Sequence, residues 1–401
     1  MALEFENLRE EVEKMALSVV GRQRRRETRL QTAVSHLNRF AHNWQAIRST
    51  LIRAEKLADE KYFRAARPLD ETVPLNAAIN PPLPPSQAII ISADGSQILP
   101  ERHAAYLYYL INVGGIIYYH GSSQPPDVFS HANLEYPEDD IGAVDFASNS
   151  GRVSIERDLM EIGTLAIKAH EQRNDAQQVL AVVDQRLLYF PFGDADAANH
   201  QAIDRWLEQM AFIREYGALL AGYVDQSSKI LVTSLLAALS ATPSFDWKML
   251  GRREATEGLT DAELFSHFLK PGQRSKTFVE VSQPNRRFAE KDPHSEICFF
   301  YFNPGGSENQ VARVDIPMWV AKDETAVNLI HALLYDQCQI MGGYPYVITR
   351  ADEIARVRRQ DQEELNFMIE LAMQRQGIDF DMTAKQRSKS YTGHGRTPHT
   401  I

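Results

Sequence analysis

The stretch Ala88-Ile-Ile-Ile-Ser-Ala-Asp94-Gly95-Ser96 decides the fold, because an uninterrupted apolar run ends there in an acid. Such a run is typical of a β-strand that is buried on both faces. A second run, Leu180-Ala-Val-Val-Asp184, has the same form. If the two strands lie side by side, Asp94 and Asp184 meet at one edge of the sheet. Paired carboxylates at such an edge favour a divalent-metal site.

A helix is predicted between these two strands, from Gly151 onward. Its apolar residues recur with a helical period, so one face is expected to pack against the sheet. The helix carries Glu156 and Glu161, and either glutamate could supply a third carboxylate. Acids from a strand, a helix and a strand predict a hydrolytic metal site.

The composition is that of a soluble globular protein, with 44% hydrophobic and 24% charged residues among 401. A formal net charge of −10 argues against a generic basic coat protein for nucleic acid. Any contact with DNA must therefore use a local basic patch and depend strongly on salt.

Both cysteines, Cys298 and Cys338, lie in apolar stretches, so we expect buried thiols in a reducing cytoplasm. The N-terminus lacks the pattern of a signal peptide, and no stretch approaches the length of a membrane span. The expected location is cytoplasmic, with no membrane association.

Four segments are expected along the chain. Residues 1–67 form an N-terminal helical extension, 68–87 a proline-rich linker, 88–377 the main domain, and 378–401 a basic tail without fixed structure. Apolar residues between Leu30 and Ala54 follow a heptad pattern, which fits one long helix that packs on its own domain or forms a dimer or partner seam. The cluster Arg22-Gln-Arg24-Arg25-Arg26 could touch phosphate or form a solvated face.

The main domain is expected to begin with the strand at Ala88 and a hairpin, in which 104–113 and 116–120 are joined by Gly114-Gly115. The helix with Glu156, the strand ending in Asp184, a helix at 199–217 and a strand at 219–225 follow. The order β-β-β-α-β-α-β resembles the ribonuclease-H-like fold, an α/β fold with a mixed sheet core and flanking helices. A second hairpin (296–303 with 310–317) and helices at 323–341 and 350–377 complete the domain.

The chain also carries Arg313-Val-Asp-Ile-Pro317 and a late motif that runs from Gly343-Tyr344-Pro345 to Ala355. Together with the two aspartate motifs, these stretches resemble the NurA nuclease family over roughly residues 88–377. The resemblance implies a manganese-dependent 5′-to-3′ DNA exonuclease that also cuts single strands internally and forms a ring-like homodimer. It further implies a partner, the hexameric DNA-translocating ATPase HerA, in the processing of DNA ends, either in DNA repair or in antiviral defence.

By this resemblance, Asp94 and Asp184 are the metal-binding aspartates, and Tyr344 is the tyrosine of the late motif. Glu156 is assigned as the third ligand, because Arg152-Val-Ser-Ile-Glu156 is similar to the family's arginine-then-glutamate helix, and Glu161 remains its competitor. The chain departs from the family at Asp352, where a histidine is common.

A second departure follows Asp184, where Gln185-Arg186 replaces the family's usual Gly-Ser. The metal ligand is retained there, but the loop has a different composition. Both departures bear on whether the site keeps its activity.

The expected mechanism uses two Mn²⁺ ions, or Mg²⁺, since hard oxygen ligands suit both cations and two ions can activate water and stabilise the leaving oxygen. The expected contacts to the DNA backbone are Arg152, Arg286, Arg287, Lys385 and Lys389. Two alternatives remain open: a DNA clamp or adaptor for the motor that has lost turnover through Asp352, and a metal-dependent phosphatase for small substrates.

Overall fold

The computed structural model describes residues 5–59, 63–101, 106–137, 150–173, 177–191, 197–242, 244–306 and 310–378. Its elements are α1 (Phe5–Arg39), α2 (Trp44–Leu57), β1 (Arg64–Pro68), β2 (Ala88–Ile98), β3 (Tyr109–His120), β4 (Asp127–Glu135), α4 (Ser150–Glu171), β5 (Gln178–Val183), α5 (Ala197–Glu215), β6 (Leu219–Val224), α6 (Leu231–Ala241), η1 (Trp247–Met249), η2 (Arg253–Thr256), α7 (Asp261–Ser266), β7 (Phe278–Ser282), α8 (Gln283–Lys291), η3 (Pro293–Ser295), β8 (Ile297–Phe302), β9 (Ala312–Pro317), α9 (Met318–Ala321), α10 (Glu324–Met341), α11 (Tyr346–Ala355) and α12 (Arg359–Arg375).

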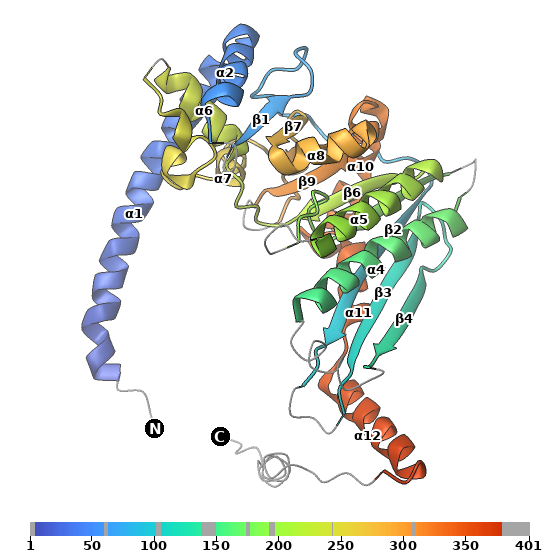
Figure 1. Cartoon of the computed structure of the whole chain (residues 1–401). Coiled ribbons are helices and arrows are strands. Elements are labelled where there is room, and N and C mark those ends of the chain that lie inside the picture. The colour runs from blue at the N-terminus through green and yellow to red at the C-terminus, as the bar shows by residue number, and fades with distance from the viewer. Residues whose placement is uncertain are drawn as a thin grey trace.

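One mixed sheet organises the molecule, in the order β1-β7-β8-β9-β6-β5-β2-β3-β4 (Figure 1). β2 pairs with β5, and β5 with β6, in parallel, whereas the other neighbours are antiparallel. The part β4-β3-β2-β5-β6 has the strand order and directions of the ribonuclease-H-like fold. The order β2-β3-β4-α4-β5-α5-β6 has the predicted form β-β-β-α-β-α-β, but its strands differ from the prediction. The two strands expected at 104–113 and 116–120 are the single strand β3, and the third strand, β4, was not predicted.

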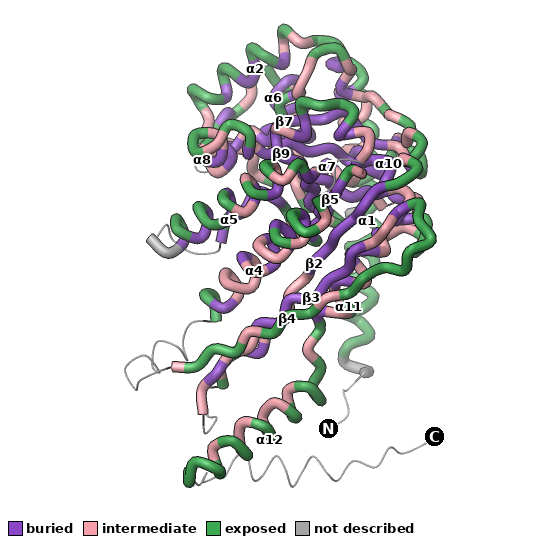
Figure 2. Tube along the Cα trace, turned by 90° about the vertical axis from the view of Figure 1, so that its right-hand side faces the viewer, coloured by how far each residue is buried: buried purple, intermediate pink, exposed green. Residues whose placement is uncertain are grey.

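Helices cover both faces of this part of the sheet, as alternation along β2 requires. Ile89 and Ile91 pack with α4 and α5 on one face, while Ile90 packs on the other face with residues of α10 and α11. Figure 2 shows the central strands as the buried layer between exposed helix surfaces. Both sides of β2 are buried, which explains its continuous apolar run.

The N-terminal residues divide into two helices and a strand, so the prediction of one long helix is wrong. The chain turns after Phe40, and the side chain of Asn43 accepts a hydrogen bond from Ala46 N at 3.1 Å to cap α2. Arg64–Pro68, at the end of the expected helical extension, is strand β1 and pairs antiparallel with β7.

The heptad residues pack on the chain's own body. Leu37, Ile47 and Leu51 are buried in a third core with residues of α6, β1 and β7. By contrast, the first half of α1 projects from the body (Figure 1), and its apolar side chains, such as Val12 and Met15, are exposed. The heptad stretch therefore packs on its own domain, as one of the two interpretations predicted.

The prediction of a turn at Gly114-Gly115 is wrong, because β3 runs straight through both glycines and pairs with β4. A Cβ at Gly114 would lie 2.6 Å from the backbone nitrogen of Ala355 in α11. A Cβ at Gly115 would lie 2.3 Å from both Phe129 and the backbone oxygen of Ser92. The glycines therefore allow close packing rather than a change of chain direction.

The predictions for the C-terminal part of the main domain agree more closely with the structure. β8 and β9 form the second hairpin, and α10 matches the predicted helix, but the helix expected at 350–377 is two helices with a break at Arg356. Cys298 and Cys338 are buried free thiols, as predicted. In the part of the chain that the structure describes, no helix combines the length and apolarity that crossing a membrane requires.

These positions predict a contrast between two leucines of α1. Leu37 is 1% exposed and Leu17 is 75% exposed. Leu37→Ala should lower the free energy of unfolding by about 2–5 kcal/mol, since it leaves a cavity in the third core. Leu17→Ala should change it by less than about 0.5 kcal/mol. Urea unfolding measures both. A Leu37→Ala protein with unchanged stability but altered mass in solution would instead make Leu37 a subunit contact.

Candidate active site

The two aspartates lie just beyond the point where β2 and β5 stop pairing. The last parallel pair is Ser92 with Val182; Asp94 follows on β2, and Asp184 follows the end of β5. The prediction that Asp94 ends its strand is wrong, because β2 continues to Ile98 in pairing with β3. Asp94 is therefore fixed within a strand, and Asp184 lies at the start of a loop.

The structure brings Glu161, rather than Glu156, to this edge. A Cβ at Gly95 would lie 2.5 Å from the Oε1 atom of Glu161, so the glutamate rests directly against β2. Both carboxylate oxygens of Glu156 instead lie 3.1 Å from Nη1 of Arg205 on α5. Five residues correspond to roughly 140° around a helix, so the two glutamates point in different directions.

A signal for Glu161 was present in the sequence. Arg157 and Glu161 have the same spacing as Arg152 and Glu156, so the arginine-then-glutamate pattern occurs twice in α4. Glu161 also lies one turn before Leu165, which is fully buried, so it continues the buried stripe of the helix. The helical period decides between the two positions, whereas the spacing motif alone does not.

Arg157 lies among the acids. Its Nε atom is 3.3 Å from Oε1 of Glu161, and its Nη2 atom donates a hydrogen bond of 2.8 Å to Oδ1 of Asp158. Asp158 is a further acid of the site that the sequence analysis missed, and its partner Arg157 was missed with it. The guanidinium offsets part of the negative charge that the fold collects here.

The loop after Asp184 is tied down from two sides. Gln185 Nε2 donates a hydrogen bond of 3.2 Å to Oε2 of Glu161. The backbone nitrogen of Leu187 donates to Oδ2 of the fully buried Asp315 at 3.1 Å. Asp315 accepts in turn from Arg313 Nε at 2.6 Å. The Arg-Val-Asp motif of β9 therefore supports the loop that carries Asp184, and Gln185 links that loop to α4.

Tyr344 reaches the same point from the segment between α10 and α11. Its hydroxyl donates a hydrogen bond of 2.8 Å to Oδ1 of Asp184, and its ring packs edge-on against Tyr223 at 5.4 Å. Burial and the neighbouring Asp184 raise the pKa of Tyr344, so the hydroxyl keeps its proton at neutral pH. Tyr344 is thus placed to orient the aspartate.

Asp352 lies at the rim, on α11. Its Oδ2 atom accepts from Nη2 of Arg356 at 2.9 Å, one turn later on a side of the helix that is partly open to solvent. Its charge still raises the pKa values of Asp94 and Asp184. The negative charge of Asp352 therefore acts on Asp94 and Asp184, although its carboxylate contacts Arg356.

The carboxylates of the site resist ionisation. Burial raises the pKa of Glu161 well above its usual range, and the nearby Asp158 and Asp94 raise it further. Loss of solvation raises the pKa of Asp94. Loss of solvation and the negative charge of Asp94 both raise the pKa of Asp184. Clustered like charges in a poorly hydrated place produce these shifts, and a bound cation would relieve them.

The donor set fits a hard divalent cation, because carboxylate oxygens suit Mg²⁺ and Mn²⁺. Among the residues that the structure describes, no three acidic, histidine or cysteine side chains stand close enough together to hold an ion as they are. Arg157 contacts Glu161 in this arrangement. Cation binding at Asp94, Glu161 and Asp184 would therefore require the guanidinium to move away from Glu161.

Comparison with known proteins adds an independent finding. The family model of the NurA domain matches residues 88–357, from the first residue of β2 to just beyond α11. The chain belongs to the NurA family. The NurA nuclease from Sulfolobus solfataricus is similar in structure, with a TM-score of 0.50 and 13% identity over 95% of this chain and 100% of the other.

Two weaker structural similarities accompany this one. A second NurA structure has a TM-score of 0.41 and 10% identity over 73% of this chain and 90% of its own. The catalytic domain of human endonuclease V has a TM-score of 0.32 and 8% identity over 82% and 97%. A search of curated proteins gives no match.

The predicted basic contacts do not gather at the acids. Arg152 is exposed on α4, and Arg286 and Arg287 lie on α8, beside β7, which three strands separate from β5. Arg286 pairs with Glu55 at 3.6 Å. The structure thus does not bring the two α8 arginines to the acids. Lys385 and Lys389 lie outside the described residues.

The raised pKa of Glu161 predicts a pH-dependent gain in stability on its removal. Because the folded protein holds the Glu161 proton more tightly than the unfolded chain does, Glu161 costs stability at neutral pH, and this cost disappears as the pH falls below the ordinary pKa of a glutamate. Glu161→Gln should therefore raise the free energy of unfolding by about 0.5–2 kcal/mol at neutral pH, with a gain that shrinks in acid.

The matched control is Glu156→Gln, because Glu156 pairs with Arg205 on an open surface. It should leave stability nearly unchanged at every pH. Thermal unfolding of both variants between pH 4.5 and 8 tests the assignment. Equal melting curves for Glu161→Gln and the wild type at neutral pH would show that Glu161 carries no electrostatic penalty.

Proposed function

We propose that this NurA-family protein is a metal-dependent DNA nuclease, with Asp94, Glu161 and Asp184 as the ligands of one or two Mn²⁺ or Mg²⁺ ions. The observation that carries the proposal is the convergence of acids from β2, α4 and the end of β5, each with a raised pKa. Paired hard cations supply an activated water and neutralise the leaving oxygen of a phosphodiester. Glu161 replaces Glu156 as the proposed third ligand.

The neighbouring residues have roles that follow from their contacts. Tyr344 holds Asp184 in one orientation through its 2.8 Å hydrogen bond. Gln185 couples the loop of Asp184 to Glu161. Arg157 neutralises Glu161 in the absence of a cation and, once released from it, offers a guanidinium for a phosphate oxygen. Together these side chains bind, orient and balance charge around the reacting phosphodiester.

The finer activity follows the family. We propose 5′-to-3′ exonuclease and single-strand endonuclease activity in DNA end processing, with a HerA-type hexameric translocase as partner and a second copy of this chain as the other half of a homodimer. The exposed apolar side chains on the projecting half of α1, among them Leu8, Val12 and Met15, support a protein partner for that helix. Repair and antiviral defence are both compatible with this chemistry.

A second candidate function is a DNA clamp or adaptor without turnover. Asp352 favours it, because this acid adds negative charge where the scissile phosphate would approach. Digestion of end-labelled DNA with Mn²⁺, with and without the motor, separates the candidates. A nuclease shortens strands, an adaptor binds without cutting, and a phosphatase for small substrates ignores the polymer.

The proposed ligands predict a set of inactive variants. Asp94→Ala and Glu161→Gln should each reduce Mn²⁺-dependent cleavage at least about a hundredfold. Even the loss of a residue that only hydrogen-bonds to a metal ligand typically lowers activity about 10–100-fold. Both should also weaken Mn²⁺ binding, measured by electron paramagnetic resonance. Glu156→Gln is the control and should keep activity within about twofold. Loss of cleavage in Glu156→Gln with full activity in Glu161→Gln would reverse the assignment.

Asp352 gives a separate test of charge at the rim. Asp352→His should retain or raise cleavage and shift its pH profile toward that of an imidazole, because the substitution removes a negative charge beside Asp94. Asp352→Ala should lower the rate by less than Asp94→Ala does. Rate measurements between pH 5.5 and 9 check both. If neither substitution changes the rate or the pH profile, Asp352 is a surface residue with no part in the reaction.

A further inference from the structure

A groove made of neighbouring cavities lies between α1 and the segment from α6 to α7. It consists of three cavities of about 540, 580 and 370 Å³. Arg25, Arg29 and Glu257 line both the first and the second, whereas Arg26 and Glu263 line both the second and the third. The three cavities are therefore neighbours along the inner side of α1, with the ion pairs Arg29–Glu257 and Arg26–Glu263 between them.

One end of the groove lies at the edge of the sheet where the acids collect. Gln226, Ser227 and Ser228 line the third cavity and come directly after Asp225, just past the end of β6. Asp225 is close enough to raise the pKa of Asp184. β6 is the parallel neighbour of β5, so this end of the groove and Asp184 share one edge of the sheet.

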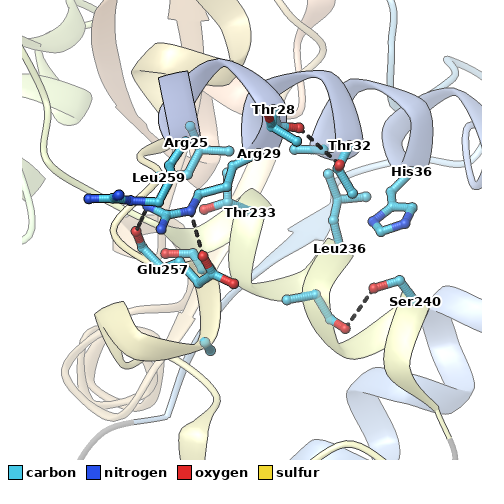
Figure 3. Close-up of a pocket in the computed structure, with 14 residues that line it drawn as sticks. Arg25, Thr28, Arg29, Thr32, His36, Thr233, Leu236, Ser240, Glu257 and Leu259 are labelled. Carbon is cyan, nitrogen blue, oxygen red and sulfur yellow. Dashed lines mark hydrogen bonds and ion pairs between the residues drawn. The ribbon is translucent and has the colours of Figure 1, made fainter. Parts of the chain in front are cut away.

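The other end lies between α1 and α6. Figure 3 shows Thr32 and His36 of α1 opposite Leu236 and Ser240 of α6, while Arg29 points toward Glu257. The lining there mixes hydroxyl groups, guanidinium groups and small apolar surface, without an aromatic side chain other than the imidazole of His36. Such a lining suits a sugar-phosphate backbone better than stacked bases.

The charges along the groove leave one cation in excess. Arg26 pairs with Glu263, and Arg29 pairs with Glu257 at 2.5 Å, so both acids of the opposite wall are neutralised. Among the described residues, Arg25 has no ion-pair or hydrogen-bond partner for its side chain, although it lines two of the cavities. A local positive site matters in a chain whose formal net charge is −10.

We propose that this groove carries the phosphate backbone of a single DNA strand to or from the acids, with Arg25 as a phosphate contact. The proposal rests on the proposed nuclease function and names the path of its substrate. Arg26 and Arg29 each retain donors beyond their glutamate partners, so they line the same path without losing their pairs. Contacts of this kind predict binding that depends on salt and tolerates any base sequence.

The test compares Arg25→Glu with Arg24→Glu in the full chain. Both arginines are exposed on α1 and both substitutions change the net charge equally, but Arg24 does not line the groove. Binding of a fluorescent 30-nucleotide single strand is measured by anisotropy in EDTA, which prevents cleavage. Arg25→Glu should weaken binding about tenfold and lower the slope of log K against log salt by about 0.7, the value of one single-strand phosphate contact.

Arg24→Glu should weaken binding less than about twofold and keep the slope. With Mn²⁺, Arg25→Glu should also raise the KM for the long strand about tenfold, whereas Arg24→Glu should leave it unchanged. The proposal that the groove binds a single strand would be contradicted by any of three results. These are equal effects of the two substitutions, no effect of Arg25→Glu, or no binding by the wild type.

A separate measurement tests the proposed nuclease function independently of the groove. Thymidine 5′-monophosphate p-nitrophenyl ester is a small phosphodiester that needs no groove. If the wild type releases no nitrophenol from it and cuts no DNA with Mn²⁺, the nuclease proposal fails, while the binding measurements in EDTA still decide whether the groove holds a single strand.

Discussion

The constraint on which this structure depends is the enforced proximity of like charges where β2 and β5 stop pairing. Asp158, Asp94 and Asp184 raise the pKa of Glu161, and Asp94 raises that of Asp184, so the surrounding fold must hold these acids against repulsion. Gly95 lets Glu161 touch β2, and Asp315 holds the loop beyond Asp184. Residues distant from the acids thus help to keep them together.

Much of the fold can be predicted from local sequence, because β2 and β5 are buried on both faces and their apolar runs have one interpretation. The order of strands and helices follows, and with it the meeting of Asp94 and Asp184. Local sequence alone does not choose between Glu156 and Glu161 as the third acid. An arginine-then-glutamate spacing occurs twice in α4, and only the packing of the helix on β2 selects Glu161.

The remaining errors share a tertiary cause. Gly114-Gly115 has the composition of a turn, yet α11 packs so closely on β3 that no side chain fits at Gly114. A contact between residues more than two hundred positions apart decides that conformation, and no local pattern reports it. The groove beside α1 escapes prediction likewise, since it exists only because α1 packs across α6, and the cluster Arg24-Arg25-Arg26 carries no sign of which arginine faces inward.

The strand β1 gives the sheet its outer edge beside β7, although it lies before the part of the chain that matches the NurA domain. The boundary that sequence similarity draws at residue 88 is therefore not a folding boundary. A chain that began there would leave β7 with unpaired backbone groups and would uncover the apolar side chains that now pack under α2. Open strands of this kind recruit other strands, so an evolutionary or laboratory truncation at that point would favour aggregation over a smaller working enzyme. The edge strand β1 therefore belongs to the folding unit, although the matched range begins after it.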